Sequence, residues 1–389
     1  MPSGRRVSAP FWLRRPGLIA RGVFTNRDRP DLDTLGRIED PEAFVWAILP
    51  HAARTFSACI ALLPGQSALP AAVAYLYCRM LDTYEDLVPD AATRDEAFKR
   101  FAARLAEDAD GSSLPGAAPT ISESTAQDAR DRAHLILVRR AHLVDRVYAA
   151  FAPAVRGVIH DLVRDMAEGM RWSSETFASQ GGTLEGDAQL LDYCRVVLGN
   201  PVVFTVRLVR LGAGVSAVLT DNEFEDAMQV GELIQLANVT RDIEKDLARG
   251  IAYDATLRGD LGRSDVVLDA ALKERVCAAR DRIMRLALAR GPSYARMLAS
   301  MRLPRISFAR ASAVLMLLFT ERYWRKCATR CGGATWDGLD STFALLASSL
   351  PALWSSRRAN LEIARVEGEY VAAAVTVAGP APAASSRNA

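Results

Sequence analysis

The fold is decided by residues 235–246, which read Gln235-Leu-Ala-Asn-Val-Thr-Arg-Asp242-Ile-Glu-Lys-Asp246. A helix over this stretch would align Asn238, Asp242 and Asp246 on one face, because they recur every four residues, and Gln235 extends the line. The other faces are apolar, at Val230, Leu233, Ile234, Leu236, Val239, Ile243 and Leu247. A helix that is apolar on most sides is buried, and buried carboxylates need a partner or a metal ion. The stretch therefore predicts a buried helix whose polar line binds a ligand.

A second polar line follows the helix that we expect near residues 67–87. Tyr75, Arg79, Asp82 and Asp86 occupy positions i, i+4, i+7 and i+11 of that helix. Two carboxylates one turn apart repel each other unless a cation lies between them, and Mg²⁺ prefers such oxygen ligands. An arginine one turn earlier can form a forked pair with a phosphate group. Taken alone, this line could also be a solvated helix face.

Two such helices in one chain favour a shared site over two unrelated surfaces. We expect a cavity with two facing acidic walls, in which Mg²⁺ ions hold a diphosphate. A helical scaffold with solvated acidic faces is the alternative, and it should show no Mg²⁺-dependent stabilisation by pyrophosphate.

Apolar residues recur at spacings of three and four along most of the chain, and β-branched alternation is scarce, so we predict an all-α protein. The expected helices lie near residues 42–63, 67–87, 93–107, 129–154, 155–180, 187–213, 221–248, 264–292, 305–330 and 339–367. We expect one helical domain over residues 39–370 that contains a loop insertion at 108–128, and a disordered tail at 371–389.

The composition excludes several classes of protein. Half of the 389 residues are apolar and 24% are charged, which is typical of a globular chain and not of a disordered one. The net charge of +2 gives no global field that would attract nucleic acid. No stretch approaches 18 apolar residues, so we expect no membrane-spanning helix. Six scattered cysteines suggest free thiols in a reducing cytoplasm, and we expect a cytoplasmic monomer.

Residues 1–38 are rich in arginine and contain no acid before Asp28, and they carry the apolar group Phe11-Trp12-Leu13. We interpret this segment as a flexible arm. A targeting segment or a peripheral contact with a membrane surface is the alternative.

Five segments resemble the squalene/phytoene synthase family. Asp82-Thr-Tyr-Glu-Asp86 and Asn238-x-x-Arg241-Asp242-x-x-x-Asp246 resemble its two aspartate-rich motifs. Residues 54–64, 165–170 and 193–199 are similar to its opening segment, to the helix before its catalytic tyrosine and to its Tyr-Cys-x-x-Val-Ala-Gly element. The five segments follow the family's order, and the first motif is closer to squalene synthases than to phytoene synthases.

The resemblance implies an isoprenoid-synthase fold, a single helical domain around a central cavity with two facing Asp-rich helices. It implies head-to-head joining of two farnesyl diphosphates through presqualene diphosphate, with NADPH reduction to squalene. No residues can be assigned to NADPH. The implied Mg²⁺ ligands are Asp82, Glu85, Asp86, Asn238, Asp242 and Asp246. The implied diphosphate-binding residues are Arg54, Tyr75, Arg79, Gln235 and Arg241. The implied catalytic residues are Asp82, Asp86, Asp242 and Asp246 together with Tyr193, which would manage the proton lost as the cyclopropane closes.

Among the departures from the family pattern are those at Lys245 and at Asn200-Pro201-Val202. Lys245, beside Glu244, replaces a residue that is usually Glu in the family, and it could pair with Glu244, touch a phosphate or face solvent. Asn200-Pro201-Val202 replaces a Val-Gly step, and Pro201 should kink the helix because it cannot donate a helical hydrogen bond.

Two further readings of the function stay open. A sibling enzyme would make dehydrosqualene, presqualene diphosphate, hydroxysqualene or phytoene with the same ionising machinery. A non-catalytic assembly factor would have kept the fold, but it should have lost carboxylates that are present here.

Overall fold

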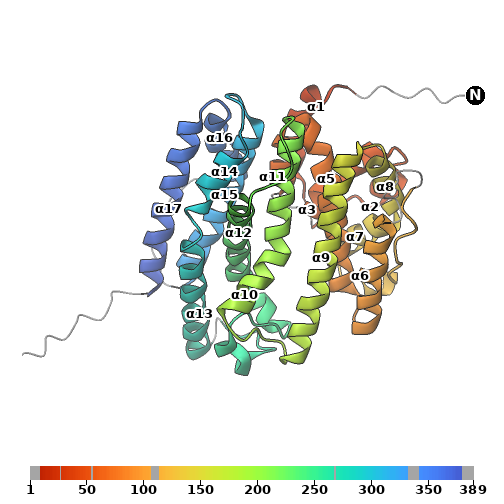
Figure 1. Ribbon diagram of the computed structural model, residues 1–389. Coiled ribbons are helices and arrows are strands. Elements are labelled where there is room, and N and C mark those ends of the chain that lie inside the picture. Colours follow the sequence, from red (N-terminus) through yellow and green to blue (C-terminus); the bar gives the residue numbers. More distant parts are fainter. Residues whose placement is uncertain are drawn as a thin grey trace, which may run out of the picture. The chain divides into compact units, whose positions relative to one another are not determined.

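The computed structural model describes residues 9–26, 28–53, 56–106, 114–266, 269–331 and 341–378 (Figure 1). Within these ranges the regular structure is helical, apart from one isolated bridge between Thr183 and Ala252. The all-α prediction is therefore confirmed for the described part of the chain. None of its helices is both long enough and apolar enough to span a membrane.

The α-helices, in chain order, are α1 (Phe11–Phe24), α2 (Leu32–Arg37), α3 (Pro41–Ala53), α4 (Phe56–Leu62), α5 (Gly65–Leu87), α6 (Ala91–Ala106), α7 (Ala129–Arg139), α8 (Ala141–Ala149), α9 (Pro153–Ser179), α10 (Asp187–Cys194), α11 (Asn200–Gly212), α12 (Asp221–Ala248), α13 (Ala270–Leu288), α14 (Ser293–Ser300), α15 (Phe308–Arg330), α16 (Thr342–Ser349) and α17 (Ser356–Ala378). The shorter turns are η1 (Glu123–Thr125), η2 (Arg195–Gly199), η3 (Ala255–Asp260) and η4 (Leu350–Leu353).

The chain divides into two compact units. The first comprises Met1–Ala167, Leu208–Val215 and Ser307–Ser312, and the second comprises Glu168–Arg207, Ser216–Ile306 and Ala313–Ala389. The bounds 39–370 for a single domain stay a prediction.

Helix α5 forms the centre of the first unit, where it packs against α3, α4, α6, α7 and α8. Its buried residues include Val73, Leu76, Tyr77, Met80 and Leu81, so most of its surface faces other helices. The first aspartate-rich motif lies at the end of this buried helix and is therefore attached to a rigid element.

A buried ion pair links three segments of the first unit. Arg104 on α6 donates from Nη1 to Asp145 Oδ2 at 3.0 Å, and both side chains are 4% exposed. The Tyr77 hydroxyl donates to the same carboxylate at 2.8 Å. Arg104 also donates to the Gly116 carbonyl oxygen, and the Tyr84 hydroxyl donates to the Pro119 carbonyl oxygen. The described part of the predicted loop insertion is thus fastened to α5 and α6.

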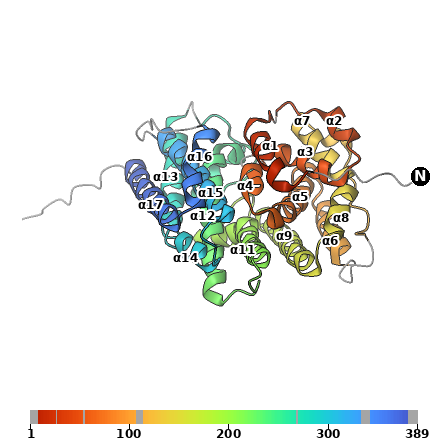
Figure 2. The same ribbon diagram turned by 90° about the horizontal axis from the view of Figure 1, so that it is seen from above.

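The predicted flexible arm is corrected by the structure, because its described residues contain α1 and α2. Helix α1 lies beside α4 (Figure 2). Their close approach requires Gly22, since a Cβ there would lie 2.8 Å from Ser57 Oγ. Arg14 pairs with Glu42 at 2.6 Å, and Arg15 donates to the Leu63 carbonyl oxygen at 3.0 Å. The arginines that suggested a solvated arm therefore help to attach this helix.

Helix α12 forms the centre of the second unit and packs against α13, α14 and the η2 turn. It begins with a capping box in which Thr220 and Glu223 exchange hydrogen bonds with each other's backbone. All seven apolar residues that the sequence places on its other faces are buried, and its bounds are the predicted 221–248. The prediction of a buried polar-lined helix is confirmed.

The C-terminal helix is longer than the sequence indicated. Helix α17 continues to Ala378, which lies inside the predicted disordered tail, and it packs against α13. Its buried apolar face includes Ile363, Val366 and Tyr370, and the helix continues beyond this face. Residues 379–389 lie outside the described ranges.

We predict that Arg104→Met lowers the free energy of unfolding by about 3–5 kcal/mol, because it leaves the Asp145 carboxylate buried without its cation. Urea unfolding followed by circular dichroism measures the change. The matched control is Lys99→Met on the same helix, whose ion pair with Asp95 is exposed, and it should cost at most about 1 kcal/mol. Equal losses in the two variants would contradict the structural role of the buried pair.

Candidate functional site

The first aspartate-rich motif lies in the last turns of α5. Arg79 Nη1 is 3.1 Å from Asp82 Oδ2, and Arg79 Nη2 donates to the Tyr75 hydroxyl at 3.1 Å. That hydroxyl lies 3.5 Å from the Ala52 carbonyl oxygen, to which it donates, and the Tyr75 ring lies beside Phe56. The predicted line from Tyr75 through Arg79 to Asp82 is therefore assembled on one helix.

Negative charge is concentrated on this helix end. Burial and the neighbouring Asp86 raise the pKa of Asp82, although Arg79 acts in the opposite direction. Glu85 and Asp86 are exposed there. Because like charges gather on one turn, a divalent cation would stabilise the ionised form of the motif.

The second motif lies along the later half of α12. Arg241 Nε donates to Asp242 Oδ1 at 2.8 Å, Arg241 Nη2 contacts Oδ2, and the guanidinium lies over the Tyr323 ring. One turn earlier, Asn238 Nδ2 donates to Gln235 Oε1 at 3.1 Å. Each motif thus has an arginine paired with its first aspartate.

Asp246 ends the second motif and is linked to Tyr193. Burial and the charge of Asp242 raise the pKa of Asp246. The Tyr253 hydroxyl donates to Asp246 Oδ2 at 3.2 Å and lies 3.5 Å from the Tyr193 hydroxyl. The rings of Tyr193 and Tyr253 are 5.3 Å apart, and Phe177 lies edge-on to both. The structure therefore joins the predicted catalytic tyrosine to the aspartate motif through a residue that the sequence reasoning missed.

Two glycine turns place Tyr253 in this position. Gly182 and Gly250 have φ angles of +88° and +82°, which favour glycine. Ala252 donates its N–H to the Gly182 carbonyl oxygen at 2.9 Å, and Leu184 donates to the Ala252 carbonyl oxygen at 3.1 Å. An aromatic residue seven positions after Asp246, just beyond Gly250, is the signal that could have suggested it.

Tyr193 lies in the last turn of α10, which ends at Cys194 directly before the η2 turn, a π-helical turn over Arg195–Gly199. The Asn200 N–H donates to the Arg195 carbonyl oxygen, five residues back. Pro201 has no N–H for the carbonyl four residues earlier, and a wider π turn accommodates this loss. Where the sequence predicts a kink at Pro201, the structure has a π turn, and α11 follows it.

The π turn contacts α12 through two glycines. A Cβ on Gly231 would lie 2.4 Å from Gly199 Cα, and a Cβ on Gly199 would lie 2.5 Å from Met228 Sδ. Glycine at both positions thus allows backbone to touch backbone. This contact fixes the position of Tyr193 next to the helix that carries the second motif.

The exposure of Lys245 shows which role this residue has among those considered for it. Lys245 faces solvent, which agrees with one of the three alternatives. Glu244 forms ion pairs with Arg280 and with Arg330. Burial and Asp242 raise the pKa of the neighbouring Asp246, and the positive charge of Lys245 acts in the opposite direction.

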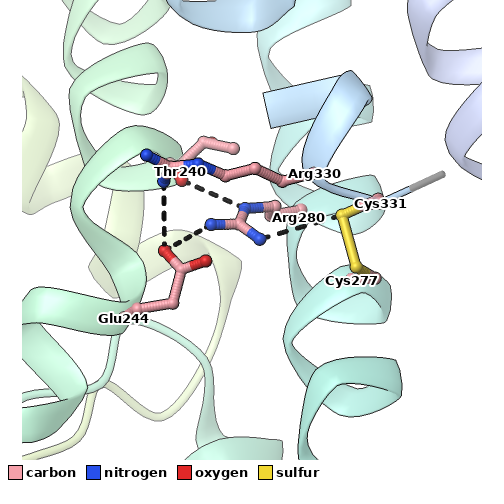
Figure 3. The surroundings of a disulfide bond; sticks show 6 residues. All are labelled: Thr240, Glu244, Cys277, Arg280, Arg330 and Cys331. Atoms are coloured by element: carbon pink, nitrogen blue, oxygen red, sulfur yellow. Dashed lines mark hydrogen bonds and ion pairs between the residues drawn. A yellow bond between two sulfur atoms is a disulfide. The ribbon is translucent and has the colours of Figure 1, made fainter. Parts of the chain in front are cut away.

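Cys277 on α13 and Cys331 directly after α15 form a disulfide (Figure 3). The prediction of free thiols is therefore wrong for these two cysteines. They are 54 residues apart in sequence, and only the packing of α13 against α15 brings their Cα atoms to 5.5 Å.

The disulfide lies next to contacts on the second motif. Arg280 donates from Nε to the Thr240 carbonyl oxygen at 3.3 Å and from Nη1 to Cys331 Sγ at 3.8 Å. Arg330 donates to the Arg241 carbonyl oxygen at 3.2 Å. These contacts, shown in part in Figure 3, brace α12 at the turn that precedes Asp242.

The structure brings the predicted residues together in two sets, one in each unit. Tyr75, Arg79, Asp82, Glu85 and Asp86 share α5, whereas Gln235, Asn238, Arg241, Asp242 and Asp246 share α12, with Tyr193 beside them. The facing of the two helices across a cavity stays a prediction. Arg54 lies outside the described residues.

The donors on both helices fit Mg²⁺. Within the described ranges, no three His, Cys, Asp or Glu side chains gather as a closed metal cage. Mg²⁺ needs no such cage, because it keeps several waters and takes phosphate oxygens as ligands. Paired carboxylates with raised pKa values at Asp82 and Asp246 suit an open site of this kind.

Comparison with known proteins identifies the family. The family model described as squalene/phytoene synthase matches residues 49–328, which include both aspartate-rich motifs and Tyr193. The chain belongs to the squalene/phytoene synthase family. The family resemblance of the five short segments is therefore confirmed, and the match covers most of the sequence.

Individual relatives are distant. The chain is 27% identical over 220 residues to squalene synthase BSS from Botryococcus braunii, over 55% of this chain and 43% of that protein. It thus spans less than half of that relative's length. Two solved structures of TcSQS, with the ligands BPH1237 and E5700, have a similar fold. Their TM-scores are 0.59 and 0.56, their sequence identities 17% and 18%, and each match covers 87% of this chain and 99% of the other.

We predict that Cys277→Ser lowers the free energy of unfolding by about 4 kcal/mol, because a disulfide that closes a loop of this length restricts the unfolded chain. Urea unfolding with and without reductant measures the loss, and reductant should destabilise the parent protein but not the variant. As a direct check, the unreduced, denatured protein should titrate four thiols, from Cys59, Cys78, Cys194 and Cys327. Titration of all six cysteines would show that the bond does not form.

Proposed function

We propose that this protein is a squalene synthase, which condenses two farnesyl diphosphates head to head through presqualene diphosphate and reduces the intermediate with NADPH to squalene. The observation that carries the proposal is the hydrogen-bonded line from Tyr193 through Tyr253 to Asp246, in a family member that keeps both aspartate pairs. An assembly factor would not need this link between a phenol and the second motif.

Diphosphate departure would use the charges on both helices. Asp82, Glu85 and Asp86 would hold Mg²⁺ in the first unit, and Asn238, Asp242 and Asp246 would do so in the second. Bound Mg²⁺ would stabilise the negative charge that develops on the leaving diphosphate. Arg79 and Arg241 can bind phosphate oxygens in the same way in which they now bind carboxylates, at 3.1 Å and 2.8 Å.

Substrate orientation would draw on the polar groups beside the arginines. The Tyr75 hydroxyl is held by Arg79, and the Gln235 side chain is held by Asn238. Both are therefore preorganised and would need little rearrangement to contact a diphosphate.

The proton lost on cyclopropane closure would pass to the phenol of Tyr193. Because the Tyr253 hydroxyl donates to Asp246, its oxygen is able to accept the Tyr193 hydroxyl proton. Tyr193 could then take a proton from the substrate as it releases its own to Tyr253, while Tyr253 passes its hydroxyl proton to the Asp246 carboxylate. The departed diphosphate is the competing acceptor. Phe177 packs against both rings and keeps them aligned.

The product assay uses purified protein with Mg²⁺ and farnesyl diphosphate, with and without NADPH, read by gas chromatography–mass spectrometry after phosphatase treatment. Squalene formed only with NADPH supports the proposal. Presqualene alcohol, or a desaturated or hydroxylated C30 product regardless of NADPH, would identify a sibling enzyme. Failure with both farnesyl and geranylgeranyl diphosphate would overturn the enzymatic proposal.

We predict that Asp82→Asn and Asp242→Asn each abolish product formation and also remove the Mg²⁺-dependent thermal stabilisation by pyrophosphate, because each takes a charge from one metal-binding pair. The controls are Asp95→Asn on α6 and Asp281→Asn on α13, whose carboxylates pair with Lys99 and Arg285 away from the motifs. Both controls should keep activity. Full activity in either motif variant would remove the metal assignment.

We predict that Tyr193→Phe lowers kcat about 10²–10⁴-fold, as loss of a general acid–base does, while pyrophosphate binding is kept. Tyr253→Phe should lower kcat by roughly 5- to 100-fold, because it breaks the hydrogen bond to Asp246 but keeps the ring. Single-turnover kinetics of presqualene diphosphate formation measures both. The control is Tyr294→Phe, which removes a hydroxyl bonded to the Ala313 carbonyl oxygen elsewhere in the same unit. A normal rate in Tyr253→Phe would reduce that residue to a packing role.

A further inference from the structure

Helix α12 buries a carboxylate that belongs neither to the second aspartate-rich motif nor to the tyrosine pair. The Glu232 side chain is 0% exposed. Its Oε1 accepts a hydrogen bond from Arg195 Nε at 2.6 Å, and its Oε2 accepts one from Arg290 Nε, between α13 and α14, at 2.7 Å. A buried carboxylate lowers stability unless it is paired and hydrogen-bonded. Each oxygen of Glu232 has its own guanidinium, which meets this requirement.

The charges around Glu232 are balanced within the protein. Arg195 Nη2 also pairs with Glu225 Oε1 at 2.5 Å, and Gln229 Nε2 donates to the same oxygen at 3.0 Å. Two carboxylates of α12 therefore face two guanidinium groups from neighbouring segments. This face of α12 holds those segments in place, and it differs in this way from the face that carries the paired aspartates.

Arg195 connects Glu232 to the segment that carries the predicted catalytic tyrosine. It is the first residue of the π turn η2, two positions after Tyr193. At the other end of the turn, Gly199 touches Gly231, the residue directly before Glu232. The π turn is therefore attached to the same part of α12 at both of its ends.

The contact between Tyr193 and Tyr253 depends on the conformation of this turn. A π turn is rare and has one residue more than the α-helical turn that it replaces. Its conversion to α-helical hydrogen bonding would rotate the residues before it by about 100° relative to those after it. The two hydroxyls are 3.5 Å apart, which is long for a hydrogen bond, so the contact tolerates little further separation.

We propose that Glu232 is a positioning residue, which through Arg195 holds the π turn so that the Tyr193 hydroxyl meets the Tyr253 hydroxyl. The inference rests on the proposed function, because it concerns the phenol that would take the proton on cyclopropane closure. A carboxylate suits this task, since it binds both guanidinium groups by charge-assisted hydrogen bonds. A glutamine would turn its NH₂ group toward one of the two arginines.

The first experiment needs no turnover. The full chain is labelled with fluorotyrosine, and the fluorine NMR signal of Tyr193 is identified by its loss in Tyr193→Phe. We expect Glu232→Gln and Arg195→Gln each to shift or broaden this signal, and Arg195→Lys to restore part of the parent signal. Arg195→Gln leaves Glu232 paired with Arg290, so folding should be kept, and circular dichroism checks it. A parent-like Tyr193 signal in both glutamine variants would overturn the proposal.

The matched control is Glu321→Gln in the same unit. Glu321 is also a buried carboxylate shared by two arginines, Arg325 on α15 and Arg365 on α17. Its loss should lower stability in a comparable way but leave the Tyr193 signal and kcat unchanged. An equal change of the signal in this control would show a general loss of packing and would overturn the proposal.

Steady-state kinetics tests the consequence for the reaction. Glu232→Gln should lower kcat about 10- to 100-fold, as a displacement of about 1 Å does, while KM for farnesyl diphosphate changes less than about twofold. In a Tyr193→Phe background, the same substitution should cost less than about twofold, because the hydroxyl that it positions is already absent. Losses that multiply in the double variant would overturn the positioning role. If the parent makes no product although the fluorine signal responds as expected, the proposed function fails and the positioning of Tyr193 stands.

Discussion

Repulsion between carboxylates one turn apart is the constraint on which the rest of this molecule depends. On α5 and on α12, paired aspartates occupy a helix that is otherwise mostly buried, and at Asp82 and Asp246 burial and a neighbouring carboxylate both raise the pKa. Such an arrangement lowers the stability of the folded state unless the charge is balanced. Packing against neighbouring helices stabilises α5 and α12, although paired like charges would destabilise each of them as an isolated helix.

Much of the fold could be predicted from the sequence, because the deciding signals are local. The apolar faces of α12 specify its bounds and burial, and the spacing of Asp242 and Asp246 places them on one helix. The arginine pairs at Asp82 and Asp242 are also local, since both partners belong to the same helix. Features that follow the helical repeat of the residues can therefore be predicted from the sequence.

The remaining features depend on contacts between distant segments. Tyr253 reaches Tyr193 only because two glycine turns pair residues 182–184 with residue 252. Cys277 meets Cys331 through helix packing, and α1 is ordered through Gly22 against α4. No periodicity within α1 shows that its arginines are used for attachment. These features needed tertiary structure because each one joins segments that are far apart in the chain.

The pairing of Arg79 with Asp82 and of Arg241 with Asp242 has a consequence for the order in which ligands bind. A metal ion that arrives alone must compete with a guanidinium already bound to the carboxylate, and it would leave that guanidinium without a partner. In the proposed enzyme, diphosphate would supply oxygens that accept the displaced arginine, so each ligand would remove the penalty that opposes the other. By thermodynamic reciprocity, the metal would then tighten diphosphate binding by the same factor. The proposed enzyme would thus bind metal weakly until a diphosphate is present.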